Sequence, residues 1–265
     1  MTSPCRTAAG APIRGVAPIV AARRVVRRDW VREMLLFLVA YVVYELARTL
    51  GTGSLHDAVA NAHRVLAVER DMDLDVEGRI QGALAGTPWL TLLDWIYLGA
   101  QTVALAVALI FAYRRSLRVY RALRSTLIGA WLVSLPVYAL FPTAPPRLAG
   151  IGIADSVSAQ TPFSLNASST GVFFNPYGAV PSLHAAFAVT LGIGVALCLR
   201  SRALRLAALL WGPLIALSVL ATGNHFVLDI AAGLAVTLIG FVAARLIAWG
   251  ASPALWRRPS RAAPA

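Results

Sequence analysis

The chain has 265 residues, of which 58% are hydrophobic and only 14% are charged. Soluble domains average about 25% charged residues, so this composition, with a mean hydropathy of +0.69, excludes an ordinary soluble fold. All 24 basic residues are arginine, which excludes every mechanism that needs a lysine. The two cysteines, Cys5 and Cys198, cannot build a disulfide framework or a zinc site on their own.

Six apolar runs are long enough to cross a bilayer, which takes about 20 residues per helix. The first run, residues 31–50, holds Glu45 and Arg48 near one end. The other five lie at residues 95–113, 125–146, 181–199, 206–222 and about 225–249. We therefore expect an all-α polytopic membrane protein, with six transmembrane helices in one bundle over residues 30–250. Residues 1–29 are expected to form a disordered basic tail and residues 251–265 a second tail.

The placement of the arginines predicts the orientation of the bundle. When the N-terminus is placed inside, 19 of the 24 arginines fall on the inner side, as the positive-inside rule requires. Both termini are then cytoplasmic, and the chain is a multi-pass protein of the cell membrane. The same rule explains the net charge of +12, so we expect the arginines to meet the lipid bilayer and expect no nucleic-acid partner.

Two long segments then lie outside. Residues 56–84 carry six carboxylates between apolar residues, which predicts an amphipathic helix or helix pair on the outer leaflet with a solvated acidic face. The acidic run at residues 71–75 also resembles the start of a calcium loop, but Val76 and Gly82 stand where that loop needs glycine and glutamate. The other segment, residues 143–180, is a loop of a length that is usually functional.

Polar residues at the outer ends of the helices are the candidates for chemistry, because such residues are expensive at membrane depth. His225 and Asp229 are four residues apart and share one helix face. The carboxylate can orient the imidazole and leave its other nitrogen free as a nucleophile or base. Gly223 would let the backbone approach an anion closely, and the free N–H groups of the helix start suit a phosphate. A plain helix-capping pair is the alternative.

A second group lies at the start of the fourth predicted helix and in the loop before it. Ser182 offers a hydroxyl beside free backbone amides, and His184 follows on the same turn. Arg147 follows two prolines that stiffen its backbone, so its guanidinium could clamp a phosphate. The alternatives are a structural histidine and an interfacial arginine that touches lipid head groups.

Together these groups predict a phosphoryl-transfer site without metal or other cofactor. One histidine would attack phosphorus and form a phosphohistidine, while the other would protonate the leaving alcohol and later deprotonate the acceptor. The arginine and the helix starts would hold the non-bridging oxygens. Zinc bound by two histidines and one aspartate is the alternative, but nothing in the sequence selects zinc over phosphate.

Two motifs resemble those of a known family. Residues 181–186 (Pro-Ser-Leu-His-Ala-Ala) and 225–233 (His-x3-Asp, then Ala-Ala-Gly) resemble the second and third motifs of the type-2 phosphatidic acid phosphatase superfamily. Residues 141–147 (Phe-Pro-x-Ala-Pro-Pro-Arg) resemble the branch of inositol phosphorylceramide synthases and their inositolphosphotransferase-like relatives. The resemblance covers roughly residues 34–249.

This resemblance implies a role for each candidate. The residue that matches His225 is the nucleophile, Asp229 orients it, and His184 is the general acid and base. Ser182 and Arg147 would bind phosphate.

The chain also departs from the pattern of the phosphatases. It has no lysine to begin their first motif, and Leu183 stands where their second motif has glycine. Ser218 and Val219 occupy the Ser-Arg positions before the third-motif histidine, so that arginine is missing. These losses favour the transferase-like branch, in which Arg147 could replace the missing cations.

The sequence thus predicts an integral membrane lipid-phosphate phosphotransferase or phosphatase that acts on the outer leaflet. The expected reaction is inositolphosphotransferase-like, with a lipid phosphate as substrate and a polyol or water as acceptor. A plain phosphatase for a lipid or polyprenyl phosphate is the alternative within this chemistry. A non-catalytic lipid-binding or transport protein is the alternative from another class. An intramembrane protease would need a serine nucleophile at membrane depth, whereas Ser182 lies at a helix start.

Overall fold

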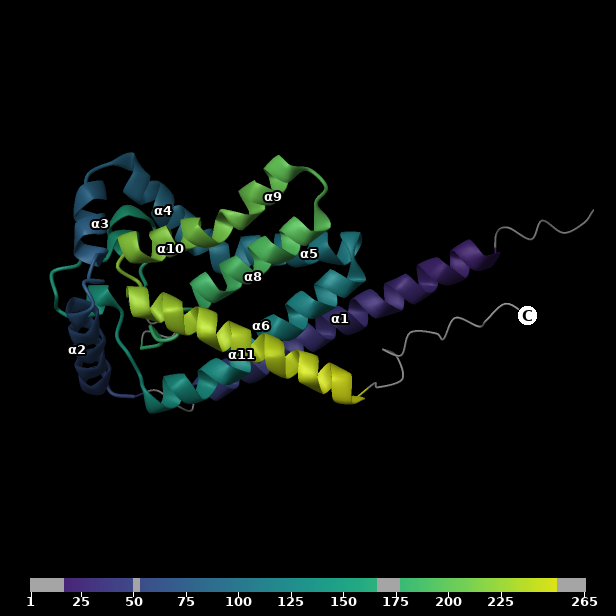
Figure 1. Cartoon of the computed structure of the whole chain (residues 1–265), viewed down its shortest axis with the longest axis horizontal. Helices are drawn as coiled ribbons and strands as arrows, with labels where there is room; N and C mark the ends of the chain where they lie inside the picture. The colour runs from purple at the N-terminus through teal and green to yellow at the C-terminus, as the bar shows by residue number, and fades with distance from the viewer. Residues whose placement is uncertain (1–16, 50–52, 166–176, 252–265) are drawn as a thin grey trace, which may run out of the picture. The chain divides into compact units, whose positions relative to one another are not determined.

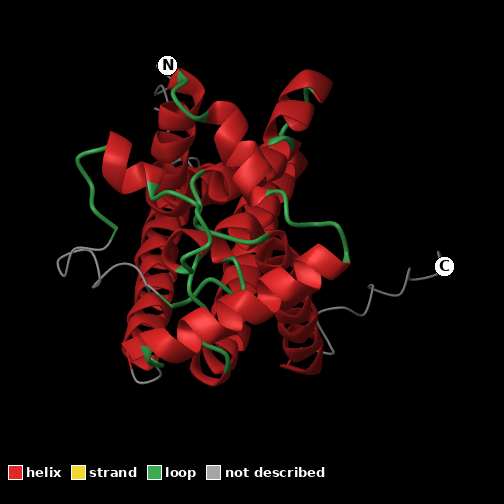
Figure 2. Cartoon of the chain, turned by 90° about the vertical axis from the view of Figure 1, so that its left-hand side faces the viewer, coloured by secondary structure: helices red, strands yellow, loops and turns green. Residues whose placement is uncertain are grey.

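The computed structural model describes residues 17–49, 53–165 and 177–251, and these residues confirm the all-α fold class (Figure 2). Their only β-type pairing is an isolated parallel bridge between Thr143 and Gly178. The chain divides into two compact units, Met1–Val42 and Val43–Ala265, and each is described by itself. Residues 1–16 and 252–265 of the expected tails, and residues 166–176 of the expected outer loop, lie outside the described ranges.

The first unit contains most of α1 (Ala17–Thr49). This helix begins inside the segment that was expected to be a disordered tail. Residues 17–42 contain no glycine, their one proline is Pro18 in the first turn, and alanine, leucine and arginine are common among them. Such a composition favours a helix. The basic charge of the tail therefore does not prevent helix formation from Ala17 onward.

Among the described residues of the second unit, three helical segments are long and apolar enough to span a membrane. They are α6 (Leu117–Leu140), the stretch Arg202–Ala221 formed by α9 (Arg202–Leu209) and α10 (Trp211–Ala221), and the part Val227–Trp249 of α11 (Val227–Ala251). A fourth span results if α4 (Pro88–Gly99) and α5 (Leu105–Arg115) are counted as one. The structure therefore supports three or four spans; the six spans and the cytoplasmic termini remain predictions.

Two of the expected spans are less regular than their composition indicates. The run predicted at residues 95–113 is bent by 51° at the π-helical turn η1 (Ala100–Ala104), and π-turns are a common cause of sharp kinks. The run predicted at residues 181–199 forms α8 (Leu183–Cys198), which has 16 residues. At about 1.5 Å per residue, α8 is shorter than the roughly 30 Å of hydrocarbon that a straight span must cross.

Helix α8 is the centre of the bundle. It contacts α5, α6, α9, α10 and α11, and most of its residues are buried. Its alanines and glycines let neighbouring helices approach closely, as is common in membrane bundles. Phe187 of α8 also lies against Trp131 of α6, whose ring stacks on Tyr44, with 5.5 Å between the ring centroids in both pairs. This packing fixes the start of α8 relative to α6 and α11.

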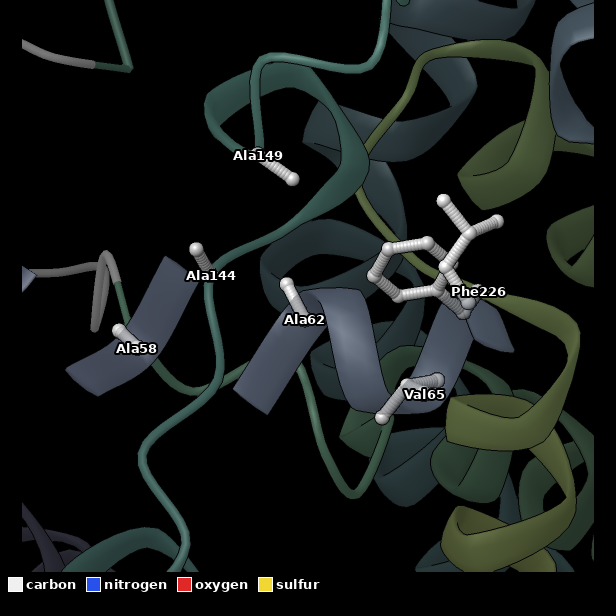
Figure 3. Packing of buried hydrophobic residues seen from close by; sticks show 7 residues of the cluster. Ala58, Ala62, Val65, Ala144, Ala149 and Phe226 are labelled. Atoms are coloured by element: carbon white, nitrogen blue, oxygen red, sulfur yellow. The ribbon is translucent and has the colours of Figure 1, made fainter. Parts of the chain in front are cut away.

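Helices α2 (Leu55–Asp71) and α3 (Glu77–Leu84) lie at the end of the bundle where α10 ends and α11 begins (Figure 1). Ala58, Ala62 and Val65 form one face of α2, which packs against Phe226 and the alanines of the loop after α6 (Figure 3). The helix pair expected over residues 56–84 is therefore present. The apolar face of α2, however, is buried against the protein's own chain and does not face lipid.

Replacing Phe226 with alanine tests this packing. The ring is fully buried, so Phe226→Ala is expected to lower the free energy of unfolding by about 3–5 kcal/mol. Phe163→Ala is the matched control, because the Phe163 side chain is 48% exposed. Thermal unfolding of the full chain in detergent measures both variants, and an equal drop in Tm for the two would contradict the packing shown here.

Candidate active site

Three segments meet at the start of α11: the loop after α6, the start of α8 and the turn between α10 and α11. The N–H of Arg147 donates to the carbonyl of Gly223 at 3.0 Å, and the N–H of Ser182 donates to the carbonyl of Asp229 at 2.9 Å. The rings of His184 and His225 are 5.7 Å apart between centroids. The structure thus brings together all six residues that the sequence singled out.

The His225 ring is held by two acceptors. Its Nδ1 lies 2.9 Å from the carbonyl oxygen of Ala179 and 3.3 Å from Oδ2 of Asp229. A carbonyl oxygen can only accept a hydrogen bond, so Nδ1 carries the proton and Nε2 keeps its lone pair. The contact with Asp229 is the one that the spacing predicts. The carbonyl of Ala179 is an additional acceptor, which residue types alone could not reveal because it belongs to the backbone.

His184 lies in the first turn of α8 and has a ring nitrogen without a hydrogen-bond partner among the described residues. This nitrogen, Nε2, is buried. Its ring stacks on Tyr97 of α4, with 4.6 Å between centroids and 27° between the planes. A buried polar atom without a partner needs an explanation, and a ligand atom would supply one. Tyr97 was missed because an aromatic residue in an apolar run carries no functional signal.

Arg147 lies inside the site. Its side chain is only 6% exposed, so the alternative of an interfacial arginine touching lipid head groups is wrong. Its Nε donates to Oδ1 of Asn224 at 3.0 Å, and its Nη1 lies 3.5 Å from Oδ2 of Asp155. The Asn224 amide in turn donates to the hydroxyl of Thr222 at 2.8 Å. The sequence reasoning missed Asn224 and Asp155, although the position of Asn224 directly before His225 could have indicated its role.

Ser182 acts as a helix cap in this structure. Its side chain is fully buried and accepts the N–H of Ala185 at 3.4 Å. Its backbone packs directly on Gly233 of α11, where an added Cβ would lie 2.2 Å from the Ser182 carbonyl oxygen. The N–H groups of the next two residues, Leu183 and His184, have no recorded acceptor within the described ranges. The start of α8 therefore keeps unused donors beside His184.

The start of α11 has no such donors, since every backbone N–H from Thr222 to Leu228 already has an acceptor. The first four bond to carbonyls of α10, and those of residues 226, 227 and 228 bond to Asp229, Glu77 and Glu69. The expectation that these amides hold a phosphate is therefore wrong. The bond from Phe226 to Asp229 also shows that Asp229 caps the helix as well as contacting His225.

Gly223 lets the loop that follows Arg147 pack closely against the turn between α10 and α11. Its φ of +68° lies in the left-handed region, which glycine adopts without steric strain. An added Cβ would lie 2.7 Å from Cγ2 of Ile153 and 3.1 Å from the carbonyl oxygen of Ala154. The space beside Gly223 is thus filled by the segment that follows Arg147, and phosphate binding by this glycine remains a prediction.

Two carboxylates expected on a solvated surface are buried. Glu69 of α2 is 0% exposed and Glu77 of α3 is 2% exposed, whereas Asp71, Asp73 and Asp75 between them are exposed. Burial, together with the nearby charges of Glu77 and Asp229, raises the pKa of Glu69 to about 8. Burial likewise raises the pKa of Glu77. The acidic segment therefore combines an exposed turn with a buried pair.

The end of α10 carries an apolar residue, Val219, where the phosphatase motif has a cation. This position, which matches the arginine of the phosphatase motif, is fully buried in an apolar cluster with Tyr97 and Ile215. Arg147 instead supplies a positive charge beside the turn that carries His225. In the part of the chain that the structure describes, no three His, Cys, Asp or Glu side chains are grouped so that they could hold a metal ion.

Comparison with known proteins agrees with this geometry. A family model described as the PAP2 superfamily matches residues 63–243, which include both histidines, Asp229 and Arg147. No curated protein and no solved structure matches the chain. The match supports the superfamily; the inositol phosphorylceramide synthase branch remains a prediction.

Gly233 provides a test of how α8 and α11 are joined. Gly233→Ala places a methyl group against the Ser182 carbonyl and is expected to lower the free energy of unfolding by about 1–3 kcal/mol. Gly82→Ala is the matched control, because Gly82 lies in helix α3 with no atom within 4 Å of an added Cβ. That variant should instead be about 0.5–1 kcal/mol more stable. Thermal unfolding in detergent measures both, and a stable Gly233→Ala protein would refute the close contact.

Proposed function

Because the chain belongs to the PAP2 superfamily, we propose that it is a membrane enzyme that cleaves or transfers the phosphate group of a lipid through a phosphohistidine on His225. The pair of histidines is the observation that carries this proposal. The two rings come from different elements and lie 5.7 Å apart. One ring has a fixed tautomer, and the other has a buried nitrogen without a partner among the described residues.

The first step forms the phosphohistidine. The lone pair of His225 Nε2 attacks phosphorus, and the bond from phosphorus to the ester oxygen breaks. The leaving alcohol takes its proton from His184, which enters the step protonated. The bonds from Nδ1 to Ala179 and Asp229 hold the nucleophile in one tautomer and stabilise the positive charge that develops on its ring.

The second step releases the phosphate group. The oxygen of water or of an alcohol attacks phosphorus, the phosphorus–nitrogen bond breaks, and Nε2 recovers its lone pair. His184 takes the proton of the attacking hydroxyl and returns to its starting state. Tyr97, stacked on the His184 ring, keeps this acid and base in one orientation through both steps.

The phosphate oxygens bind to the positive side of the site. Arg147 supplies the charge, and Asn224 and Asp155 hold its guanidinium in place. The unused amides of Leu183 and His184 at the start of α8 supply further donors. The backbone N–H groups at the start of α11 already have acceptors and do not bind the phosphate. Ser182 contributes by capping α8, which fixes the direction of the N–H groups of Leu183 and His184.

The acceptor distinguishes two reactions. Transfer to inositol or another polyol is supported by the loss of the phosphatase cations, with apolar Val219 in place of an arginine. Hydrolysis of a lipid or polyprenyl phosphate is the alternative and needs only water. In both cases we place the site on the outer face of the cell membrane, as the arginine distribution predicts.

Phosphorus NMR on the purified protein in detergent tests the reaction, with a panel of lipid phosphates in the presence and absence of inositol. His225→Ala should lower turnover about 10⁴-fold or more, and His184→Ala should lower it about 10²- to 10⁴-fold because general acid–base catalysis is lost. His56→Ala is the matched control, since that side chain is 91% exposed and should leave turnover unchanged.

The reaction products distinguish a phosphatase from a transferase. Free phosphate released regardless of inositol assigns a phosphatase, and a new phosphomonoester or phosphodiester signal that needs inositol assigns a transferase. Undiminished turnover in His225→Ala would refute the phosphohistidine. No turnover of any lipid, together with no binding of vanadate, would leave a non-catalytic lipid-binding protein as the better account.

Arg147→Lys tests the role of the guanidinium. Lysine keeps the charge but loses the fixed fork that bonds Asn224 and faces Asp155. We expect kcat/KM to fall about 10- to 100-fold, which corresponds to one lost hydrogen bond to a charged group. Arg79→Lys on exposed α3 is the control. If Arg147→Lys were as active as the unmodified chain, charge alone would suffice.

A further inference from the structure

The first turn of α11 receives acceptors from distant parts of the chain. The N–H of Val227 donates to Oε1 of Glu77 at 3.0 Å, and the N–H of Leu228 donates to Oε1 of Glu69 at 2.7 Å. These partners lie 150 and 159 residues earlier in the sequence. Helix starts usually find acceptors in their own capping residues or in water. Here two other helices provide them.

The burial of these two carboxyls requires a proton. With both groups ionised, Oε2 of Glu69 would be buried without any hydrogen-bond partner among the described residues. The two carboxyls accept from adjacent N–H groups of one helical turn and are both buried, and a carboxylate has no donor, so only a proton on one of them lets that oxygen form a hydrogen bond with the other carboxyl. The raised pKa of Glu69, about 8, agrees with this geometry.

We propose that Glu69 and Glu77 share one proton and act as positioning residues that hold the start of α11, and with it His225 and Asp229, in place for phosphoryl transfer. The inference rests on the proposed function for its catalytic part. The geometry supports it because residues 227 and 228 join the two site residues. Freeing their amides would let His225 move away from the carbonyl of Ala179.

Helix α2 contacts the first turn of α11 in two ways. Val65 lies on its face against Phe226, and Glu69 follows one helical turn later and bonds to Leu228. The apolar contact fixes the position of the turn, and the carboxyl fixes the direction of its N–H group. Helix α3 adds the second carboxyl through Glu77. Two elements remote from the histidines thereby decide where α11 begins.

The shared proton makes this cap sensitive to pH. The charged groups that act on Glu69 are Glu77 from α3 and Asp229 from α11. The pKa of Glu69 is raised in the folded state from 4.5 to about 8. Its contribution to stability is therefore full below about pH 4.5 and is lost as the pH rises through about 8.

Hydrogen exchange of the full chain in detergent tests the cap without any substrate. Protection of the amides of residues 227 and 228, corrected for intrinsic exchange, should fall as the pH rises through about 8. Glu77→Gln should keep the protection and remove its pH dependence, because the amide accepts from Val227 and donates to Glu69 at every pH. Glu77→Leu should lose the protection of the Val227 amide at every pH, because that amide then has no acceptor. Asp71→Gln and Asp71→Leu, at an exposed carboxylate, are the matched controls.

Turnover of a lipid phosphate by the same variants tests the positioning role. Glu77→Leu should lower kcat about 100-fold, the usual effect of a shift of about 1 Å in a reacting group, and leave KM unchanged. Glu77→Gln should restore kcat and abolish any loss of activity near pH 8. Equal loss in both variants, or protection of residues 227 and 228 that does not change with pH, would overturn the proposal.

The two readouts separate this inference from the proposed function. If the unmodified chain turned over no lipid phosphate but the exchange results were as expected, the proposed function would fail and the proton-sharing cap would stand. If turnover followed His225 and His184 but the two Glu77 variants behaved alike, the proposed function would stand and the cap would fail.

Discussion

The structure depends on how the first turn of α11 satisfies its backbone N–H groups. An α-helix leaves these donors without partners of its own, and this helix begins directly behind His225. Carboxyls from α2, α3 and α11 itself accept three consecutive N–H groups. The preceding four are bonded to α10. The nucleophile therefore sits on a segment whose backbone is fixed on both sides, which suits a group that must keep one orientation.

The starts of α8 and α11 therefore have different roles in the site. The start of α11 is occupied by carboxylates, and their negative charge disfavours a phosphate there. Within the described ranges, the start of α8 keeps the amides of Leu183 and His184 without acceptors, and Arg147 lies across the turn beside Asn224. Both helix starts carry a histidine, so they look alike in sequence. Their electrostatics differ, and in our proposal this difference decides on which side of the histidines the phosphate oxygens lie.

The sequence reasoning succeeded where signals are local and failed where they are not. Hydropathy found the apolar runs, but it measures composition and cannot see that α8 has only 16 residues or that the run at residues 95–113 bends by 51°. The acidic residues of 56–84 looked alike as a solvated face. Glu69 and Glu77 differ from their neighbours only because the fold brings the start of α11 against them.

The sequence by itself determined the all-α class, the resemblance at the two histidine motifs and the contact between His225 and Asp229, although His225 lies just before α11 and not on it. These features rest on composition and on a spacing of four residues, which the chain's local geometry converts directly into position. Only the tertiary structure decided the tautomer of His225, through the carbonyl of Ala179, and the burial of the two glutamates. Those contacts join residues 46 to 159 positions apart, and no local pattern encodes an acceptor that arrives from so far along the chain.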